Sequence, residues 1–159
     1  MPNITSHEYY MQLALKEARK AFNKDEVPIG AIIVDKDGNI LSRAHNQGEH
    51  GSSALNHAEI LAIYKATQKL KQPRLWDCKI YVTLEPCTMC AAAISFARIK
   101  TLYFGAYDEK GGAVTSGVKF YEQKNCHHKP NVLGGILENE CSQILKNFFK
   151  NKRQNKKEN

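Results

Sequence analysis

His57-Ala58-Glu59 and, about 26 residues further along the chain, Pro86-Cys87-Thr88-Met89-Cys90 are the two stretches around which the sequence is organised. They supply one imidazole and two thiols, side chains that zinc commonly takes as ligands in proteins. Catalytic zinc sites use three protein ligands and keep a fourth position for water. The histidine and the two cysteines match that number, so the glutamate would remain free to move protons.

The surroundings of these residues favour a shared site. His57 follows a polar loop over residues 47–56 and opens a predicted helix, while Cys87 and Cys90 follow a predicted strand and lie one turn apart on a second helix. Thiolates are stabilised by the unpaired N–H groups at a helix N-terminus. We therefore predict that His57, Cys87 and Cys90 bind a catalytic zinc ion and that Glu59 is the catalytic acid and base.

Each stretch taken alone has other interpretations. A Cys-x-x-Cys pair could be a redox pair or half of a structural zinc site, and a structural site would need a fourth ligand, for which Cys126, His127 and His128 are the candidates. His-Ala-Glu is a common helical triplet, in which Glu59 could simply cap the first turn. The two stretches together, in this order and each opening a helix, favour the catalytic interpretation.

Composition and length predict a single folded domain. The chain has 159 residues, of which 42% are hydrophobic and 25% charged, as in ordinary globular proteins. It contains no apolar run long enough to span a bilayer, and its first eight residues lack a signal pattern. The cysteine count is odd, and the one closely spaced pair suits a metal. We therefore expect a reducing, cytoplasmic environment and no membrane association.

The positive charge is concentrated at the C-terminal end. The net charge is +7, and residues 146–159 hold six basic residues and one acidic residue, which leaves +2 for residues 1–145. Such a segment can contact a polyanion, or it can be a solvated tail that aids solubility. We expect a folded domain over residues 1–150 and a basic, disordered tail over residues 151–159.

Hydrophobic periodicity predicts an α/β protein. Helices are expected over residues 6–22, 57–70, 88–97 and 138–150, and strands over 29–34, 40–45, 79–84, 101–105 and 131–133. Thr5 would cap the first helix, and Ile60, Leu61, Ile63 and Tyr64 would form the buried stripe of the second. The strand-helix-strand order over residues 79–105 implies a parallel crossover. The expected fold is a sheet of about five strands covered by helices.

Further segments resemble the bacterial tRNA-specific adenosine deaminases, a branch of the cytidine deaminase superfamily. The wider superfamily shares only H-x-E and P-C-x-x-C. The Thr83-Leu84-Glu85 lead-in and the double-Phe basic ending point to this branch. The resemblance covers roughly residues 5 to 153 and implies a three-layer α/β/α cytidine-deaminase-like fold with a mixed sheet. The matching segments outside the metal-ligand stretches are Glu26–Ala31, Ala44-His45-Asn46, Phe104-Gly105-Ala106 and Phe148–Asn151.

This resemblance implies a function and a set of site residues. The implied reaction is the zinc-dependent hydrolysis of adenosine to inosine at the wobble position of a tRNA anticodon, in a cytoplasmic homodimer with one zinc per subunit. Hydroxide would attack C6 of the base while Glu59 moves protons. The implied substrate contacts are Asn46 to the base, Ile29 to its face, Asp108 and Lys110 to flanking nucleotides, and Phe149, Lys152 and Arg153 to the RNA.

Simpler roles exist for several of these contacts, and the chain departs from the family at three places. Asn46 could be an ordinary turn residue, Phe149 could pack in the core, and the basic residues could be solvated. Departures are Ala54-Leu55-Asn56, where the family usually has a proline, and His127 and Gly117 in the late loop.

Two other functions fit parts of the sequence. A deaminase of a free base or nucleoside, such as guanine or cytosine, would use the same chemistry, but a small substrate gives no reason for a basic C-terminal segment. A non-enzymatic RNA-binding module with a structural zinc would give Glu59 no special role.

Overall fold

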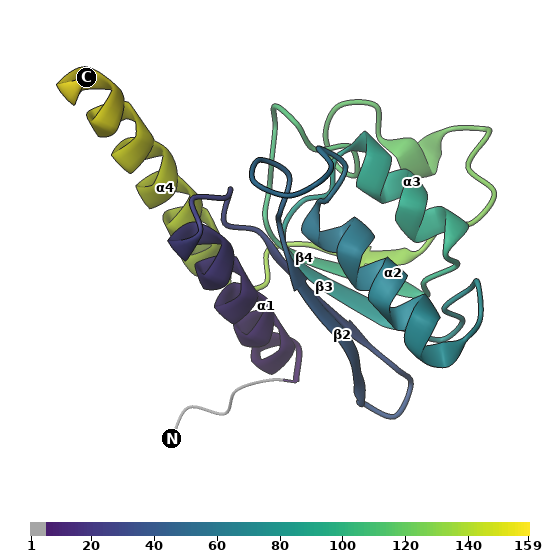
Figure 1. The fold of residues 1–159 in the computed structure, drawn as a ribbon. Helices are drawn as coiled ribbons and strands as arrows, with labels where there is room; N and C mark the ends of the chain where they lie inside the picture. The colour runs from purple at the N-terminus through teal and green to yellow at the C-terminus, as the bar shows by residue number, and fades with distance from the viewer. Residues whose placement is uncertain (1–5) are drawn as a thin grey trace.

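The structure, a computed structural model that describes residues 6–159, is a mixed five-stranded sheet between two layers of helices (Figure 1). This is the predicted three-layer α/β/α fold, and the predicted cap residue Thr5 lies outside the described residues. The elements are α1 (Ser6–Asn23), β1 (Gly30–Val34), β2 (Ile40–His45), α2 (Ala58–Leu70), β3 (Lys79–Leu84), α3 (Thr88–Phe96), β4 (Thr101–Ala106), the 3-10 helix η1 (Phe120–Glu122), β5 (Asn131–Leu133) and α4 (Glu138–Glu158).

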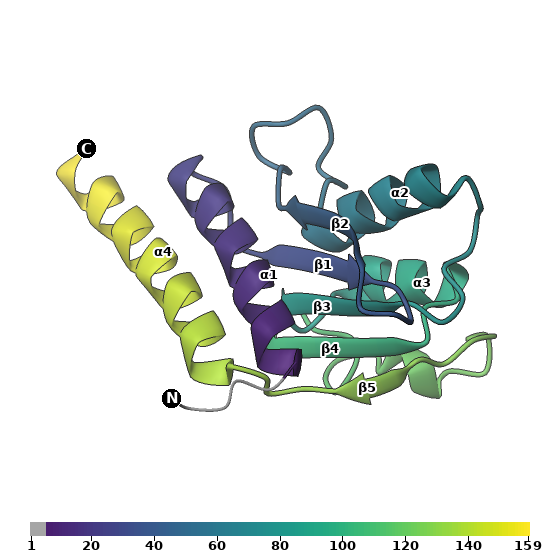
Figure 2. The ribbon, with the colours of Figure 1, turned by 90° about the horizontal axis from the view of Figure 1, so that it is seen from below.

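The strands lie in the order β2-β1-β3-β4-β5 (Figure 2). β1 is antiparallel to both β2 and β3, whereas β3, β4 and β5 run parallel to one another. The turn from β1 to β2 uses Gly38 at φ +87°, a conformation that glycine adopts without strain. The predicted crossover from β3 through α3 to β4 is confirmed. α3 begins just beyond the end of β3, where the start of α2 meets it.

α1 and α4 cover one face of the sheet (Figures 1 and 2). Two glycines in the strands, which have no side chain, allow these helices to pack directly against the strand backbone. A Cβ on Gly30 of β1 would lie 2.0 Å from the carbonyl oxygen of Ala14, and one on Gly105 of β4 would lie 2.3 Å from Sγ of Cys141. Larger side chains would push α1 or α4 outward, so both glycines fix the depth at which these helices pack.

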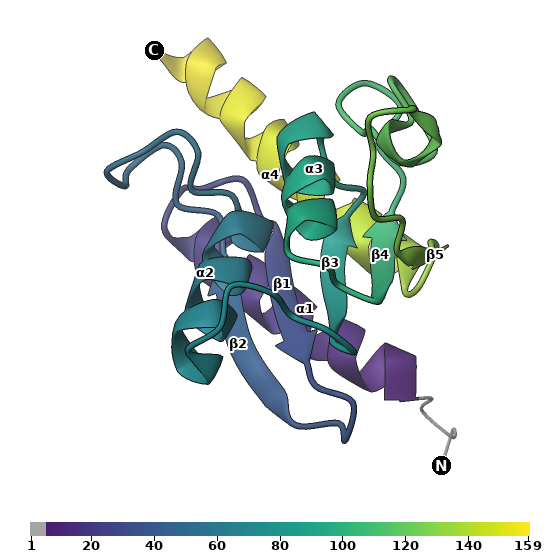
Figure 3. The same cartoon turned by 90° about the vertical axis from the view of Figure 1, so that its right-hand side faces the viewer.

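α2 and α3 cover the other face, side by side (Figure 3). The buried residues of α2 include Ala58, Ala62 and Ala66 rather than the predicted stripe over residues 60–64, and Tyr64 is 63% exposed. The stripe prediction was therefore wrong. α2 packs so closely on the sheet that methyl side chains fill the space, and the larger aliphatic residues pack along its flanks.

α4 is longer than predicted and continues through the segment expected to be a disordered tail. Residues 151–158 contain no glycine or proline and several straight-chain residues, which extend an existing helix readily because nucleation has already occurred. Its last turns project beyond the sheet (Figure 1). Neither α4 nor any other helix within residues 6–159 combines the length and the apolar character that crossing a membrane requires.

Candidate active site

The N-termini of α2 and α3 bring together the three residues predicted to bind metal. His57 is the N-cap of α2 and Cys87 is the N-cap of α3, and Cys90 lies one turn into α3. Nδ1 of His57 lies 3.6 Å from Sγ of Cys87 and 3.6 Å from Sγ of Cys90. All three ligand atoms lie within 4.8 Å of one another, so one cation could contact all of them.

The spacing of these atoms suits zinc. Tetrahedral zinc has Zn–S distances of about 2.3 Å and Zn–N distances of about 2.0–2.1 Å, which separate nitrogen and sulfur ligands by about 3.6 Å. The two observed nitrogen–sulfur distances agree with this value. One imidazole and two thiols are also ligands of the softness that zinc accepts. The group of candidate ligands in the described residues has three members, which matches a zinc ion that keeps one position open.

Hydrogen bonds within the cluster shift the pKa values of its three side chains in different directions. A hydrogen bond from the Cys90 thiol and another from His57 lower the pKa of the Cys87 thiol to about 4. The same contact with Cys87, together with burial, raises the pKa of Cys90. The hydrogen bond to Cys87 also raises the pKa of His57. The contacts within the cluster therefore stabilise a thiolate at Cys87, the form in which a cysteine binds a metal.

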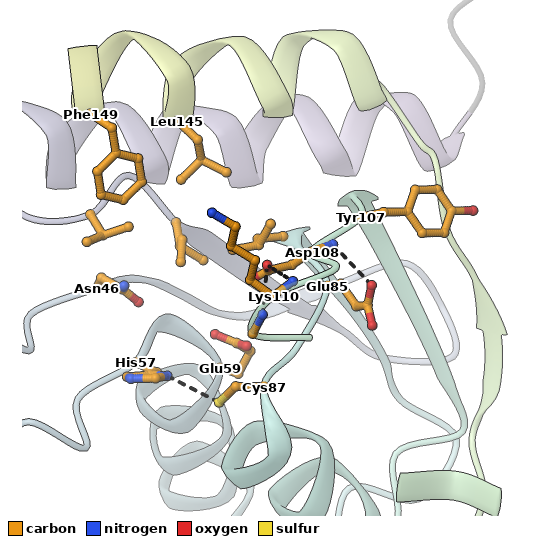
Figure 4. Close-up of a pocket in the computed structure, with 14 residues that line it drawn as sticks. Asn46, His57, Glu59, Glu85, Cys87, Tyr107, Asp108, Lys110, Leu145 and Phe149 are labelled. Atoms are coloured by element: carbon orange, nitrogen blue, oxygen red, sulfur yellow. Dashed lines mark hydrogen bonds between the residues drawn. The ribbon is translucent and has the colours of Figure 1, made fainter. Parts of the chain in front are cut away.

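Glu59 lies in the first turn of α2 and is only 4% exposed. Its carboxylate faces the pocket beside His57 and Cys87 (Figure 4) and does not belong to the group of candidate ligands. Burial raises the pKa of Glu59 to about 7. A carboxyl group of this kind can both accept and donate a proton near neutral pH.

A pocket of about 610 Å³ opens above these residues (Figure 4). That volume suits a small organic group such as one nucleobase with its sugar. The pocket is lined by five residues that the resemblance implies as substrate contacts, namely Ile29, Asn46, Asp108, Lys110 and Phe149. Phe149 extends over it from α4 (Figure 4). The remaining lining residues are Val27, His57, Glu59, Leu84, Glu85, Cys87, Tyr107, Gly111 and Leu145.

Asn46 also supports the start of α2. Its Oδ1 accepts a hydrogen bond from the backbone N–H of Ala58 at 2.8 Å. Because a backbone N–H can only donate, this contact identifies the side-chain oxygen and leaves the amide N–H₂ group as the part of Asn46 available to a molecule in the pocket.

Lys152 and Arg153 do not line the pocket. Nζ of Lys152 forms an ion pair with Oδ1 of Asp25 at 2.5 Å and lies 5.6 Å from the ring centre of Phe148. Arg153 is exposed on the projecting part of α4. The basic residues of α4 therefore lie outside the pocket, beyond its Phe149 side.

The late-loop residues considered as further metal ligands are engaged elsewhere. Sγ of Cys126 donates to the carbonyl oxygen of His128 at 3.2 Å. Nε2 of His128 lies 2.7 Å from the carbonyl oxygen of Ile99. In the part of the chain that the structure describes, neither joins the candidate metal cluster, so these contacts favour an open site over a structural one.

Sequence reasoning missed two buried carboxylates that hold the loops around the pocket. Glu26 accepts hydrogen bonds from the backbone N–H groups of Glu49, at 3.0 Å, and His50, at 2.6 Å. Glu85 holds the loop that follows β4 in the same manner. For Glu85 the available signal was an acidic residue directly after a mostly apolar strand, whereas Glu26 follows Asn23, Lys24 and Asp25 and has no such contrast.

Comparison with known proteins gives consistent results. Residues 5–153 match the model of the MafB19-like deaminase family. A tRNA-specific adenosine deaminase of Agrobacterium fabrum is 54% identical over 150 residues, which cover 94% of this chain and 98% of that protein. A solved structure from work on tRNA:A34 deaminases that edit A to I at the wobble position of transfer RNA is 54% identical, with a TM-score of 0.84, and the match covers 86% of this chain and 99% of that one.

A guanine deaminase from Nitrosomonas europaea shares the fold. It is 21% identical, with a TM-score of 0.73, and the match covers 89% of this chain and 83% of that one. Similarity at this level supports the architecture alone.

Proposed function

This chain belongs to the MafB19-like deaminases and to the tRNA-specific adenosine deaminases, and from that membership we propose that it converts adenosine to inosine at the wobble position of a tRNA anticodon, using one zinc ion per subunit. The observation that carries this proposal is the meeting of His57, Cys87 and Cys90 beside a buried, uncoordinated Glu59 at the base of a nucleoside-sized pocket. A structural zinc site would not need that carboxylate.

Zinc, when bound by His57, Cys87 and Cys90, supplies a water molecule acidic enough to lose its proton near neutral pH. Glu59 accepts that proton and passes it to the ring nitrogen beside C6 as water adds to that carbon. The carboxylate then takes the proton of the new hydroxyl group on C6 and delivers it to the amino group, so that the C6–N bond breaks, ammonia leaves and the carbonyl group of inosine forms. Its pKa of about 7 suits both directions of transfer, because the group is neither a strong acid nor fully protonated near neutral pH.

Asn46 and Ile29 orient the base. The amide N–H₂ of Asn46 donates to an acceptor on the base edge, since its oxygen is already bonded to Ala58. Ile29 offers an apolar surface against the face of the ring.

Replacing Asn46 with aspartate should separate its two roles. The carboxylate still accepts from Ala58 at the helix N-terminus, so α2 should keep its start and the melting temperature should stay close to that of the wild type. Both donors to the base are lost, so kcat/KM should fall by about a hundredfold. Steady-state kinetics and thermal melting measure the two effects. Asn131→Asp, at the exposed start of β5, is the control, and equal losses in both variants would contradict the role of Asn46.

The surface around the pocket suits RNA. Asp108, Lys110 and Phe149 line the pocket. Under this proposal Asp108 and Lys110 contact the nucleotides flanking the base, and the ring of Phe149 stacks on a base. Lys152 and Arg153 continue this surface along α4, where basic side chains can meet phosphates. Oδ1 of Asp108 accepts from the backbone N–H groups of Lys110 and Gly111, so Asp108 also shapes its own loop.

The protein acts as a homodimer in the cytoplasm under this proposal. Exposed apolar side chains support the dimer, because Leu55, Tyr64, Trp76 and Phe96, which is 74% exposed, lie on or next to the segments that form the α2–α3 layer. The five free cysteines suit a reducing compartment. Light scattering on the purified protein tests the assembly, and a mass of one chain at micromolar concentration would contradict it.

The direct test is to incubate the zinc-loaded protein with total bacterial tRNA and sequence the product. Inosine is read as guanosine, so we expect A-to-G changes confined to the first anticodon position. Changes at many positions, or none, would contradict the proposal. Free guanine and cytosine serve as competing substrates, and faster turnover of either would favour the small-molecule alternative.

Deleting residues 151–159 should weaken RNA binding and leave the pocket intact. The deletion removes Lys152, Arg153, Lys156 and Lys157 together with Glu158, so the apparent Kd for an anticodon stem-loop should rise about tenfold or more, with a shallower dependence on salt. Zinc content should not change, because this segment lies outside the pocket. Fluorescence anisotropy at several salt concentrations measures the effect, and an unchanged Kd would contradict RNA contact by α4.

A further inference from the structure

The loop over residues 107–117 forms one wall of the pocket without regular secondary structure. Tyr107, Asp108, Lys110 and Gly111 line the pocket from this loop (Figure 4). A loop of this length with adjacent glycines at positions 111 and 112 is intrinsically adaptable, so contacts from outside it must hold its shape.

Glu85 supplies those contacts. It follows the last residue of β3, is 2% exposed and directs its carboxylate into the loop. Its Oε2 accepts from the backbone N–H groups of Val114 at 3.1 Å, Thr115 at 3.0 Å and Ser116 at 3.2 Å. Its Oε1 accepts from the backbone N–H of Asp108 at 3.1 Å and from the hydroxyl groups of Thr115 and Ser116. One carboxylate therefore ties both ends of the loop together.

The loop closes tightly around this carboxylate. A Cβ on Gly112 would lie 2.4 Å from Oε2 of Glu85 and 2.4 Å from the carbonyl oxygen of Asp108. The next residue, Ala113, donates its backbone N–H to the carbonyl oxygen of Pro86 at 2.9 Å. Consecutive residues 85–87 thus hold the loop and provide the candidate ligand Cys87, so the position of the loop is tied to that of the metal cluster.

We propose that Glu85 is a positioning residue that fixes the 107–117 loop, so that Asp108 and Lys110 meet the nucleotides flanking the target base. This inference rests on the proposed function. Glu85 acts through the loop and not in proton transfer, because donors from the loop occupy both of its oxygens. It governs how firmly the RNA is held, whereas Glu59 governs the chemical step.

Two substitutions at Glu85 should loosen different parts of the loop. In Glu85→Gln, the amide oxygen can take the position of Oε2 and keep its three backbone donors. The amide N–H₂ then occupies the position of Oε1, where the hydroxyl groups of Thr115 and Ser116 can rotate to accept, but the N–H of Asp108 loses its acceptor. Glu85→Ala removes all of these contacts.

Residue-resolved hydrogen exchange on the full-length, zinc-loaded protein tests the anchor. Glu85→Gln should speed exchange at Asp108 about tenfold or more and change residues 114–116 little, whereas Glu85→Ala should speed all four amides. Glu26→Gln is the matched control, because Glu26 is a similarly buried carboxylate that holds Glu49 and His50. It should leave the 107–117 loop unchanged. Unchanged exchange in both Glu85 variants would overturn the proposal.

Kinetics with an anticodon stem-loop test the consequence. The loop is expected to bind the flanking nucleotides equally strongly in the ground state and the transition state. Glu85→Gln should therefore raise KM about tenfold and leave kcat nearly constant. A fall in kcat as large as the fall in kcat/KM would overturn the positioning role. Loss of zinc from Glu85→Gln, measured by elemental analysis, would also overturn it, because Glu85 would then be supporting Cys87.

Failure of the proposed function and failure of this inference are distinguished by different measurements. A wild-type chain that leaves RNA unmodified contradicts the assignment of substrate, and with it the part of this inference that concerns flanking nucleotides. The exchange pattern still decides whether Glu85 anchors the loop, since that measurement needs no substrate.

Discussion

Replacing Glu59 with glutamine should lower the rate of adenosine deamination by about a thousandfold or more and leave zinc and RNA binding close to wild-type values. Glutamine has nearly the same shape and fits the same buried position, but it cannot accept the proton from water or return one to the base. General acid–base catalysis typically contributes a factor of about 10² to 10⁴, and here one group is expected to act in two steps. Single-turnover kinetics with an anticodon stem-loop measures the effect.

The controls distinguish lost chemistry from lost structure. Elemental analysis should find about one zinc per chain in Glu59→Gln, since the carboxylate lies outside the group of candidate ligands. Glu109→Gln, at an exposed carboxylate of the 107–117 loop that does not line the pocket, should keep nearly full activity. A Glu59→Gln protein that deaminated adenosine at the wild-type rate would contradict the role of Glu59 as catalytic acid and base, and one that lost its zinc would show that Glu59 is a ligand. Wild-type protein that bound zinc and RNA but deaminated nothing would favour the non-enzymatic alternative.

Local sequence patterns were sufficient for most of the fold. β2, β3 and β5 have the predicted limits, and β1, β4 and the first three helices differ from prediction by one residue at one end. These elements have strong period-two or period-3.6 patterns bounded by turn residues. The three residues predicted to bind zinc lie together because His57 and Cys87 each begin a helix, and the starts of α2 and α3 meet just beyond the end of β3.

The predictions that failed depended on packing between distant segments. Periodicity assigned Tyr64 to the core, but the close approach of α2 to the sheet leaves room only for alanines such as Ala62. Composition suggested a disordered tail, but the preceding turns of α4 propagate the helix through residues 151–158. Lys152 remains a proposed RNA contact, and the structure adds a neighbour that its sequence did not indicate, because Lys152 forms an ion pair with Asp25, two residues beyond the end of α1. No local pattern encodes these three-dimensional neighbours.

The roles of Glu26 and Glu85 show the same limit at the site itself. Each is an acidic residue whose partners are backbone N–H groups far along the chain, and backbone groups carry no sequence signal. The resemblance to a family identified Glu85 only as part of a matching segment. The structure supplies the physical reason for a carboxylate there, because a wall of the pocket is built from loop amides that need a common acceptor.

Replacing Cys90 with alanine should abolish both zinc binding and deamination, whereas the same change at Cys126 should abolish neither. Both cysteines are buried, so the two substitutions remove similar volumes from the interior. Cys90 lies 3.6 Å from His57 in the candidate cluster, and two ligands hold zinc far more weakly than three. After dialysis, zinc in Cys90→Ala should fall to less than about one tenth of an equivalent per chain. Wild-type protein treated with a chelator should be as inactive as Cys90→Ala until zinc is restored.

Cys126 is the control. It contacts Ser95 and the carbonyl oxygen of His128, so its loss should lower the melting temperature slightly and leave the zinc content unchanged. If both variants lost zinc, the late loop would be part of the metal site, and the metal would have a structural role in place of the catalytic one argued from the open cluster.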